Sequence, residues 1–241
     1  MPGCGTPSGG DASIGHTESG ASNLESLEKL ARICTRCRLA ESRTNVVFGQ
    51  GKADADLMII GEAPGYHEDQ QGLPFVGAAG RLLTTLLEEV GIARSSVYIA
   101  NVLKCRPPNN RDPLDDEVEA CKGYLFRQLE LVSPIVIVTL GNFATKVILA
   151  RTAGISRLRG QVFPYRNNSV VIPTYHPAAL LRGSSPSRLA DARSDMRLIA
   201  KTLDERRRMQ YERPKKEAFE WVEKGTPARV GAQSASQLEL F

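Results

Sequence analysis

The chain has 241 residues, of which 41% are hydrophobic and 24% charged, and its formal net charge is +4. This composition is typical of a globular protein, and the length suffices for one large domain or two small ones. The mildly basic charge permits a nucleic-acid partner but does not require one. The sequence has no run of about 18 apolar residues, which excludes a membrane-spanning helix, and it shows no secretory signal. We therefore expect a cytoplasmic protein whose five cysteines are ligands or free thiols rather than disulfides.

The N-terminal half begins with residues 1–22, which are rich in Gly and Ser and predict a disordered leader. Apolar residues then recur at helical spacing over residues 23–34 and predict a first helix. Residues 57–60 form a short apolar run, which predicts a strand buried on both faces. A long glycine-rich loop follows this strand, and a second helix is predicted over residues 78–91.

The rest of the chain alternates between predicted strands and helices. Strands are predicted over residues 97–103, 135–140 and 170–172, and helices over residues 115–132, 141–150 and 186–208. This alternation with short connections predicts a parallel sheet between helices. We expect an α/β fold of three layers, αβα, with a central four-stranded parallel sheet in a single domain over residues 23–208. Residues 209–241 are polar and basic and predict a flexible tail.

The loop after the first strand carries side chains that could form a site, because ligands of open α/β sheets bind beyond the carboxyl ends of the strands. Glu62 is the first side chain after the closing glycine, and Phe75 follows a proline that fixes its approach. The loop lacks the Gly-Lys-Ser/Thr of a P-loop and is too long for a dinucleotide-binding turn. Taken alone, it slightly favours an ordinary connection whose phenylalanine packs into the core.

Several polar or aromatic residues follow the predicted strands. Glu62, Glu68 and Phe75 follow the first strand, Asn101 ends the second, and His176 follows the fourth. Each of these residues alone is more often a turn former or an ordinary loop residue. Ordinary loop residues would not be expected to meet at one edge of the sheet. Their convergence there indicates a binding or catalytic site.

The cysteines give the sharpest signal. Cys34 and Cys37 form a C-x-x-C pair, whereas Cys105 and Cys121 come from a loop and the helix after it. Four thiolates suit either a 4Fe–4S cluster or a structural zinc ion, although the second pair is spaced unlike a zinc ribbon. A buried free thiol is a plausible alternative for Cys121 but not for the C-x-x-C pair. Cys4 lies in the leader, and we expect it to be uninvolved.

Four motifs, together with the cysteines, resemble the family 4 uracil-DNA glycosylases, the iron–sulfur branch of that superfamily. They are GEAPG (residues 61–65), ED-xx-G-x-PFVG-xx-G (68–80), NVLKCRPP (101–108) and HPAALLR (176–182). The resemblance extends in collinear order from about Leu24 to Leu203. It implies a four-stranded parallel sheet, a 4Fe–4S cluster on the four cysteines, and excision of deaminated uracil from DNA by hydrolysis of its N-glycosidic bond. The product would be an abasic site that initiates base excision repair.

The resemblance also implies roles for the pocket residues. Phe75 would stack on a uracil flipped out of the DNA, a step that costs a few kcal/mol. The Asn101 amide would accept from uracil N3–H and donate to O4, whereas cytosine presents the reversed pattern. His176 would stabilise charge on uracil O2 as the glycosidic bond breaks.

The carboxylates differ from the better-known relatives, which carry Asp at the uracil-binding position of Ala63. A general base at that place is therefore missing. Glu62 or Glu68 would instead position the water and stabilise the cationic sugar, and Glu68 would also exclude the 5-methyl group of thymine.

The resemblance further implies three DNA contacts. Leu180 would be the wedge that enters the DNA stack, and Arg182 and Arg188 would hold phosphates. Two alternatives remain. A sister branch that stays covalently attached to DNA carries Gln at Ala63 and a basic loop with a nucleophilic His, and both features are missing here. A non-catalytic DNA-binding iron–sulfur module would not require a pocket of the size of a base.

The last five residues, 237–241, resemble the peptide by which bacterial repair proteins bind the sliding clamp. Gln237 would hydrogen-bond the rim of an apolar pocket, which Leu238, Leu240 and Phe241 would occupy or flank. The alternative is that this segment packs back on the domain. These features predict a monomeric bacterial enzyme of the cytoplasm, associated with the nucleoid, that acts on single- or double-stranded DNA.

Overall fold

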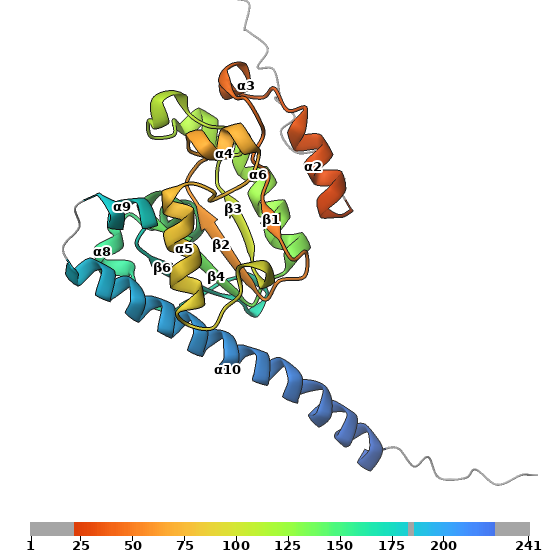
Figure 1. Ribbon diagram of the computed structural model, residues 1–241. Coiled ribbons are helices and arrows are strands. Elements are labelled where there is room, and N and C mark those ends of the chain that lie inside the picture. The colour runs from red at the N-terminus through yellow and green to blue at the C-terminus, as the bar shows by residue number, and fades with distance from the viewer. Residues whose placement is uncertain (1–21, 183–185, 225–241) are drawn as a thin grey trace, which may run out of the picture.

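The fold is built around one β-sheet, and the computed structural model describes residues 22–182 and 186–224 (Figure 1). The strand order is β1-β3-β2-β4-β6-β5, and the four central strands are parallel. These central strands are the four predicted ones: β2 (Leu57–Gly61), β3 (Tyr98–Asn101), β4 (Val136–Leu140) and β6 (Val170–Thr174).

The expectation of four strands is wrong in number, because the sheet has six. β1 (Gln50–Gly51) pairs antiparallel with β3 at one edge, and β5 (Phe163–Pro164) pairs antiparallel with β6 at the other. A strand of two residues is too short to show the alternation from which strands are predicted. The α/β class and the parallel centre are confirmed.

Helices cover both faces of the sheet. They are α2 (Leu24–Arg32), α3 (Leu39–Ser42), α4 (Tyr66–Gln71), α5 (Ala78–Glu88), α6 (Asp115–Val132), α7 (Gly141–Leu149), α8 (Ile155–Leu158), α9 (Pro177–Leu181) and α10 (Pro186–Lys224), with 3-10 turns η1 (Arg94–Ser96), η2 (Pro108–Asn110) and η3 (Arg166–Asn168). The four short helices α3, α4, α8 and α9 lie in segments that were expected to be loops.

Alternate side chains of β2 enter two different hydrophobic clusters. Leu57 and Ile59 pack in a cluster with α5 and α10, whereas Met58 and Ile60 pack in a cluster with α6 and α7. The helix residues involved are Leu83, Leu87, Met196 and Ile199 in the first cluster, and Leu125, Leu129, Ala144 and Ile148 in the second. Because successive strand residues point to opposite faces, this apolar run fills both layers of the core, as the three-layer prediction requires.

The last helix is longer than predicted. Figure 1 shows α10 passing along the sheet and continuing beyond it, and the helix ends at Lys224 rather than near Arg208. The first part of the expected tail is therefore helical. The leader, apart from residue 22, and the segment 237–241 lie outside the described residues.

No helix in the described part of the chain is long and apolar enough to cross a membrane.

A buried lysine connects β3 to α6. Lys104 is 1% exposed, and its Nζ donates hydrogen bonds to Asn101 O at 2.8 Å and to Gln128 Oε1 at 2.5 Å. The Gln128 amide in turn donates to Phe48 O at 2.9 Å and to Tyr98 Oη at 3.1 Å. Burial lowers the pKa of Lys104 to about 8. These bonds hold the carboxyl end of β3 in place.

We expect Lys104→Met to lower the free energy of unfolding by about 3 kcal/mol, because the substitution leaves two buried acceptors without a donor. Urea denaturation of both proteins measures the difference. Lys201→Met, at an exposed lysine of α10, is the matched control and should change the urea midpoint little. Equal midpoints for the two variants would show that the buried lysine contributes no net stability.

Candidate functional site

A cavity of about 810 Å³ lies beyond the carboxyl ends of the central strands. The structure places around it all five residues that follow the predicted strands: Glu62, Glu68, Phe75, Asn101 and His176. They come from the β2–α4 segment, the loop before α5, the end of β3 and the start of α9. Their convergence follows from the topology, since parallel strands end at the same edge of the sheet.

Asn101 is the floor of this cavity. It is 1% exposed, and in the described part of the chain its Oδ1 is the single buried side-chain nitrogen or oxygen without a hydrogen-bond partner. Gly61 lies opposite it in the parallel register. A Cβ atom at Gly61 would lie 2.3 Å from Asn101 Oδ1 and 2.6 Å from Cζ of Phe75, so any larger residue would displace both. The glycine therefore lets an amide oxygen and an aromatic ring meet in one small space.

Phe75 belongs both to the core and to the cavity. It is 7% exposed and packs in the cluster with α5 and α10, yet its ring also lines the cavity. Its centroid lies 5.7 Å from that of His176, with an angle of 33° between the rings. Its φ of +54° is unusual for a bulky residue, and such a conformation costs about 1–3 kcal/mol. The interpretation of Phe75 as a core residue is thus partly correct, since its ring packs in the hydrophobic core and also lines the cavity.

His176 is held in one orientation and one tautomer. It precedes α9, and its Nδ1 accepts a hydrogen bond from the backbone N–H of Ala178 at 3.2 Å. The proton of the neutral ring is therefore on Nε2. Burial, assisted by Arg182 and opposed by Glu68, lowers the pKa of His176 to about 4. The ring is neutral at pH 7 and offers Nε2–H as a donor.

The two glutamates have different environments. Glu68 Oε1 accepts hydrogen bonds from the backbone N–H groups of Val76 and Gly77, both at 2.9 Å, so this side chain fixes the loop that carries Phe75. Glu62 is half-buried, and its carboxylate has no hydrogen bond or ion pair within the described residues. Burial raises the pKa of Glu62, and the nearby Asp112 raises it further. Of the two, Glu62 is the carboxylate that remains available for chemistry.

The other predicted residues lie at or near the rim. Ala63 lines the cavity and is half-buried, and Arg182 lines it and is exposed. Leu180 packs against the core, whereas its neighbour Leu181 is 51% exposed and lines the cavity. Arg188, in the first turn of α10, is exposed and outside the cavity lining.

Five charged or amide side chains of the cavity lining were not singled out in the sequence. Asn110, Arg111 and Asp112 come from the loop after Cys105, and Asn142 and Lys146 come from α7. The only signal that could have identified them is position, because both segments follow the carboxyl ends of predicted strands.

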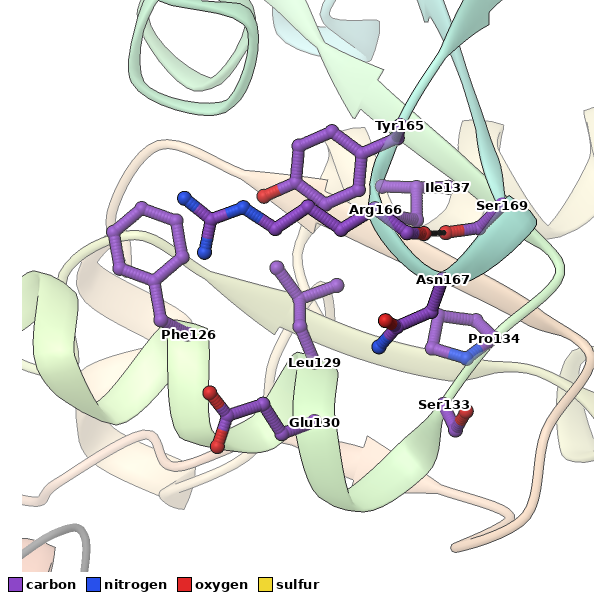
Figure 2. Close-up of a pocket in the computed structure, with 10 residues that line it drawn as sticks. All are labelled: Phe126, Leu129, Glu130, Ser133, Pro134, Ile137, Tyr165, Arg166, Asn167 and Ser169. Atoms are coloured by element: carbon purple, nitrogen blue, oxygen red, sulfur yellow. Dashed lines mark hydrogen bonds between the residues drawn. The ribbon is translucent and has the colours of Figure 1, made fainter.

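A second hollow of about 270 Å³ lies at the opposite ends of β4 and β6 (Figure 2). Arg166 lies between Phe126 and Tyr165 there, and burial raises the pKa of Tyr165. None of the residues singled out in the sequence lines this hollow.

The four expected ligand cysteines gather in a third hydrophobic cluster, away from the cavity lining. Cys34 and Cys37 are half-buried, whereas Cys105 and Cys121 are 7% and 8% exposed. Burial raises the pKa of Cys121 to about 12, while the nearby Lys104 acts in the opposite direction and Cys105 and Cys37 act in the same direction. The four thiols are thus close enough to affect one another.

The sulfurs of Cys105 and Cys121 accept N–H hydrogen bonds. Arg43 Nη1 donates to Cys105 Sγ at 3.4 Å, and the Lys104 backbone N–H donates to Cys121 Sγ at 3.3 Å. Over residues 22–182 and 186–224, no group of three or more His, Cys, Asp or Glu side chains is arranged as a site for a metal ion.

Comparison with known proteins agrees with this geometry. Residues 48–197 match the family described as the uracil DNA glycosylase superfamily. A type-4 uracil-DNA glycosylase of Sulfurisphaera tokodaii is 47% identical over 169 residues, which cover 66% of this chain and 77% of that protein. The type-4 enzyme of Archaeoglobus fulgidus is 49% identical over 66% of this chain and 84% of its own, and that of Thermotoga maritima is 46% identical over 67% and 85%. The chain therefore belongs to the uracil-DNA glycosylase superfamily, in its type-4 branch.

Proposed function

We propose that this protein excises uracil from DNA by hydrolysing the N-glycosidic bond, which leaves an abasic site and starts base excision repair. One observation carries the proposal: a buried amide oxygen, Asn101 Oδ1, has no donor and lies in a cavity beside an aromatic ring. An unsatisfied buried acceptor costs about 1–3 kcal/mol, so it favours a ligand that supplies an N–H group. The N3–H of uracil is such a donor.

Asn101 distinguishes uracil from cytosine in this proposal. Oδ1 accepts from uracil N3–H, and the amide nitrogen donates to O4. Cytosine has an acceptor at N3 and a donor at C4, so both partners of the amide would be mismatched. A site built to hydrogen-bond one pattern rejects the other strongly, because its buried polar groups are left unpaired.

Phe75 provides the flat surface on which the base rests. A base must leave the duplex to reach a cavity at the edge of a sheet, and stacking offsets part of the unstacking cost. Glu68, through its bonds to Val76 and Gly77, holds the loop that presents this ring. Exclusion of the thymine methyl group by Glu68 stays a prediction.

His176 acts on the leaving group. As the glycosidic bond breaks, negative charge develops on uracil O2, and a donor aimed at that oxygen stabilises the transition state. The Nε2–H of the neutral ring is that donor, because Nδ1 is occupied by the Ala178 N–H. With a pKa of about 4 the ring remains a neutral donor over the physiological range.

Glu62 acts on the sugar. Its unpaired carboxylate stabilises the positive charge that develops on the deoxyribose and orients the attacking water. Ala63 supplies no carboxylate for this purpose. At the rim, Arg182 and Arg188 contact phosphates, and the wedge is Leu180 or the more exposed Leu181.

The four cysteines fit an iron–sulfur cofactor. Cys34, Cys37, Cys105 and Cys121 would hold a 4Fe–4S cluster, which four cysteine thiolates suit. N–H···S bonds such as those to Cys105 and Cys121 stabilise thiolate ligands. When bound, the cluster would cross-link the segment after α2 to α6 and to the loop after β3. No step of excision involves it.

Two further parts of the proposal concern partners. The segment 237–241, outside the described residues, would bind a bacterial sliding clamp through Gln237, Leu238, Leu240 and Phe241. Such a tether raises the local concentration of an enzyme at replicating DNA. A monomeric state, a bacterial cytoplasm near the nucleoid, and action on single- or double-stranded DNA stay predictions.

Incubation with an oligonucleotide that contains one uracil, followed by alkali and a denaturing gel, tests the function. We expect strand cleavage at the uracil and none in the same oligonucleotide with thymine. A slowly migrating adduct would instead indicate the covalent sister branch. DNA that is bound but left intact would indicate a binding module.

We expect Asn101→Ala, Asn101→Asp and His176→Ala each to lower the single-turnover excision rate by roughly 100- to 1,000-fold, because each removes a contact made in the transition state. DNA affinity, measured by fluorescence anisotropy, should change far less. His67→Ala, at an exposed histidine outside the cavity lining, is the matched control. If His176→Ala excised uracil as fast as this control, the leaving-group role would be wrong.

We expect the purified protein to be brown, with broad absorbance near 400 nm and about four irons per chain, as for thiolate-ligated clusters. Cys37→Ala should lose this absorbance and unfold at lower urea, whereas Cys4→Ala should keep both properties. Absorption spectra, iron analysis and urea titration measure them. A colourless protein with one zinc and no iron would contradict the assignment.

A further inference from the structure

The loop over residues 107–114 forms one wall of the cavity. It contains η2, and both Asn109 and Asn110 have left-handed backbone conformations, with φ of +55° and +53°. Asn110, Arg111 and Asp112 of this loop line the cavity, although no motif of the sequence singles them out. Two consecutive left-handed residues turn the chain sharply, so the loop needs other contacts to hold its position.

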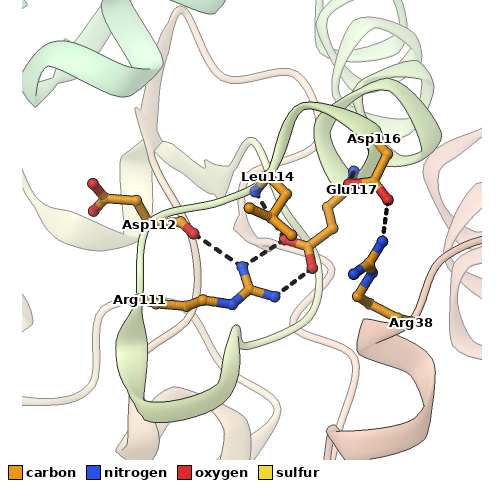
Figure 3. Close-up of polar contacts among 6 residues, drawn as sticks. All are labelled: Arg38, Arg111, Asp112, Leu114, Asp116 and Glu117. Atoms are coloured by element: carbon orange, nitrogen blue, oxygen red, sulfur yellow. Dashed lines mark hydrogen bonds and ion pairs between the residues drawn. The ribbon is translucent and has the colours of Figure 1, made fainter.

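A pair of opposite charges provides these contacts. Arg111 donates from Nη1 to Glu117 Oε2 at 2.9 Å and from Nη2 to Glu117 Oε1 at 2.6 Å. The Glu117 side chain is 0% exposed, and it also accepts from the Leu114 N–H at 3.0 Å. Arg111 Nη1 donates to the backbone oxygen of Asp112 at 2.9 Å as well. This Arg111–Glu117 clamp fixes the backbone of the loop on both sides of Asp112, because bidentate pairs restrict geometry (Figure 3).

The side chain of Asp112 takes no part in the hydrogen bonds of the clamp. Figure 3 shows the Asp112 carboxylate pointing away from Arg111 and Glu117. It is exposed, lines the same cavity as Glu62, and has no hydrogen bond or ion pair with any described residue. Glu62 is likewise unpaired. Two unpaired carboxylates on one cavity repel each other, so their placement does not stabilise the fold. A role in the site would explain why both are there.

We propose that Asp112 is a positioning residue of the excision site: the Arg111–Glu117 clamp holds its carboxylate where it adds to the negative potential at Glu62. This inference rests on the proposed function. Asp112 acts through Glu62 and need not touch the base. Its charge makes the part of the cavity around Glu62 more favourable for a cationic sugar, and it also makes Glu62 bind its proton more tightly.

The other charged groups of the cavity do not replace Asp112 in this role. Glu68 is bound by the Val76 and Gly77 N–H groups, and Arg111 is bound by Glu117. His176 is neutral, and its pKa is lowered to about 4. Lys146 and Arg182 line the cavity as exposed cations, and neither contributes to the raised pKa of Glu62. The raised pKa of Glu62 agrees with this assignment, since burial and Asp112 are its causes.

Single-turnover excision by Asp112→Asn between pH 5 and 8 tests the proposal. We expect the rate at neutral pH to fall several-fold, because the cationic transition state loses a nearby negative charge. We also expect the acidic limb of the profile to move to lower pH, because Glu62 then ionises more easily. Asp112→Glu, which keeps the charge, should restore most of both effects.

Asp115→Asn is the matched control, since it makes the same charge change three residues away, at an exposed position outside the cavity lining. Arg111→Lys keeps a positive charge but not the bidentate clamp, and it should shift the profile in the same direction as Asp112→Asn. Circular dichroism and urea titration confirm that each variant is folded.

Identical pH profiles for Asp112→Asn and Asp115→Asn, in an enzyme whose wild-type form excises uracil, would overturn the role of Asp112 alone. A wild-type protein that leaves uracil in the DNA would overturn the proposed function, and this inference with it.

Discussion

The site depends on the absence of a side chain at one point of the sheet. Gly61 ends β2 directly opposite Asn101 at the end of β3, and a Cβ there would collide with both the Asn101 amide and the Phe75 ring. The parallel register of two buried strands sets this pairing, and the register is itself fixed by the apolar residues that fill both faces. In the proposed function, recognition of a base is thus a consequence of how the core packs.

Two polar side chains, one buried and one half-buried, hold the backbone on either side of this site. Lys104 holds the backbone of Asn101 from behind, and its own N–H contacts a cysteine of the third cluster. Glu68 holds the backbone after Phe75 from the other side. The groups at the cavity are therefore held by polar contacts to the backbone around them, and Lys104 connects the cysteine cluster to the floor of the site.

The sequence predicted the elements that a local pattern of residues determines. It missed those that form only through contacts with distant parts of the chain. The four long strands and the main helices follow from periodic apolar residues, and the residues at the strand ends follow from topology. β1 and β5 have two residues each and form only because a neighbouring strand is present. The shape of the loop around Asp112 depends on Glu117, six residues from Arg111 on another element, and no pattern of the loop itself indicates that partner. Leu180 was expected to be the wedge that enters DNA, but it packs against the core and its neighbour Leu181 is the more exposed, because helical phase decides which of two adjacent leucines faces the core.

The unpaired Asn101 oxygen also bears on how a catalytic cycle ends. While the cavity is empty, the folded protein has a buried acceptor without a donor. Free uracil presents the same N3–H as uracil in DNA, so under the proposed role of Asn101 the released base satisfies that acceptor as well as the substrate does. The feature that selects the base therefore also slows its departure, and an enzyme of this design has to clear its own product before it can search for the next lesion.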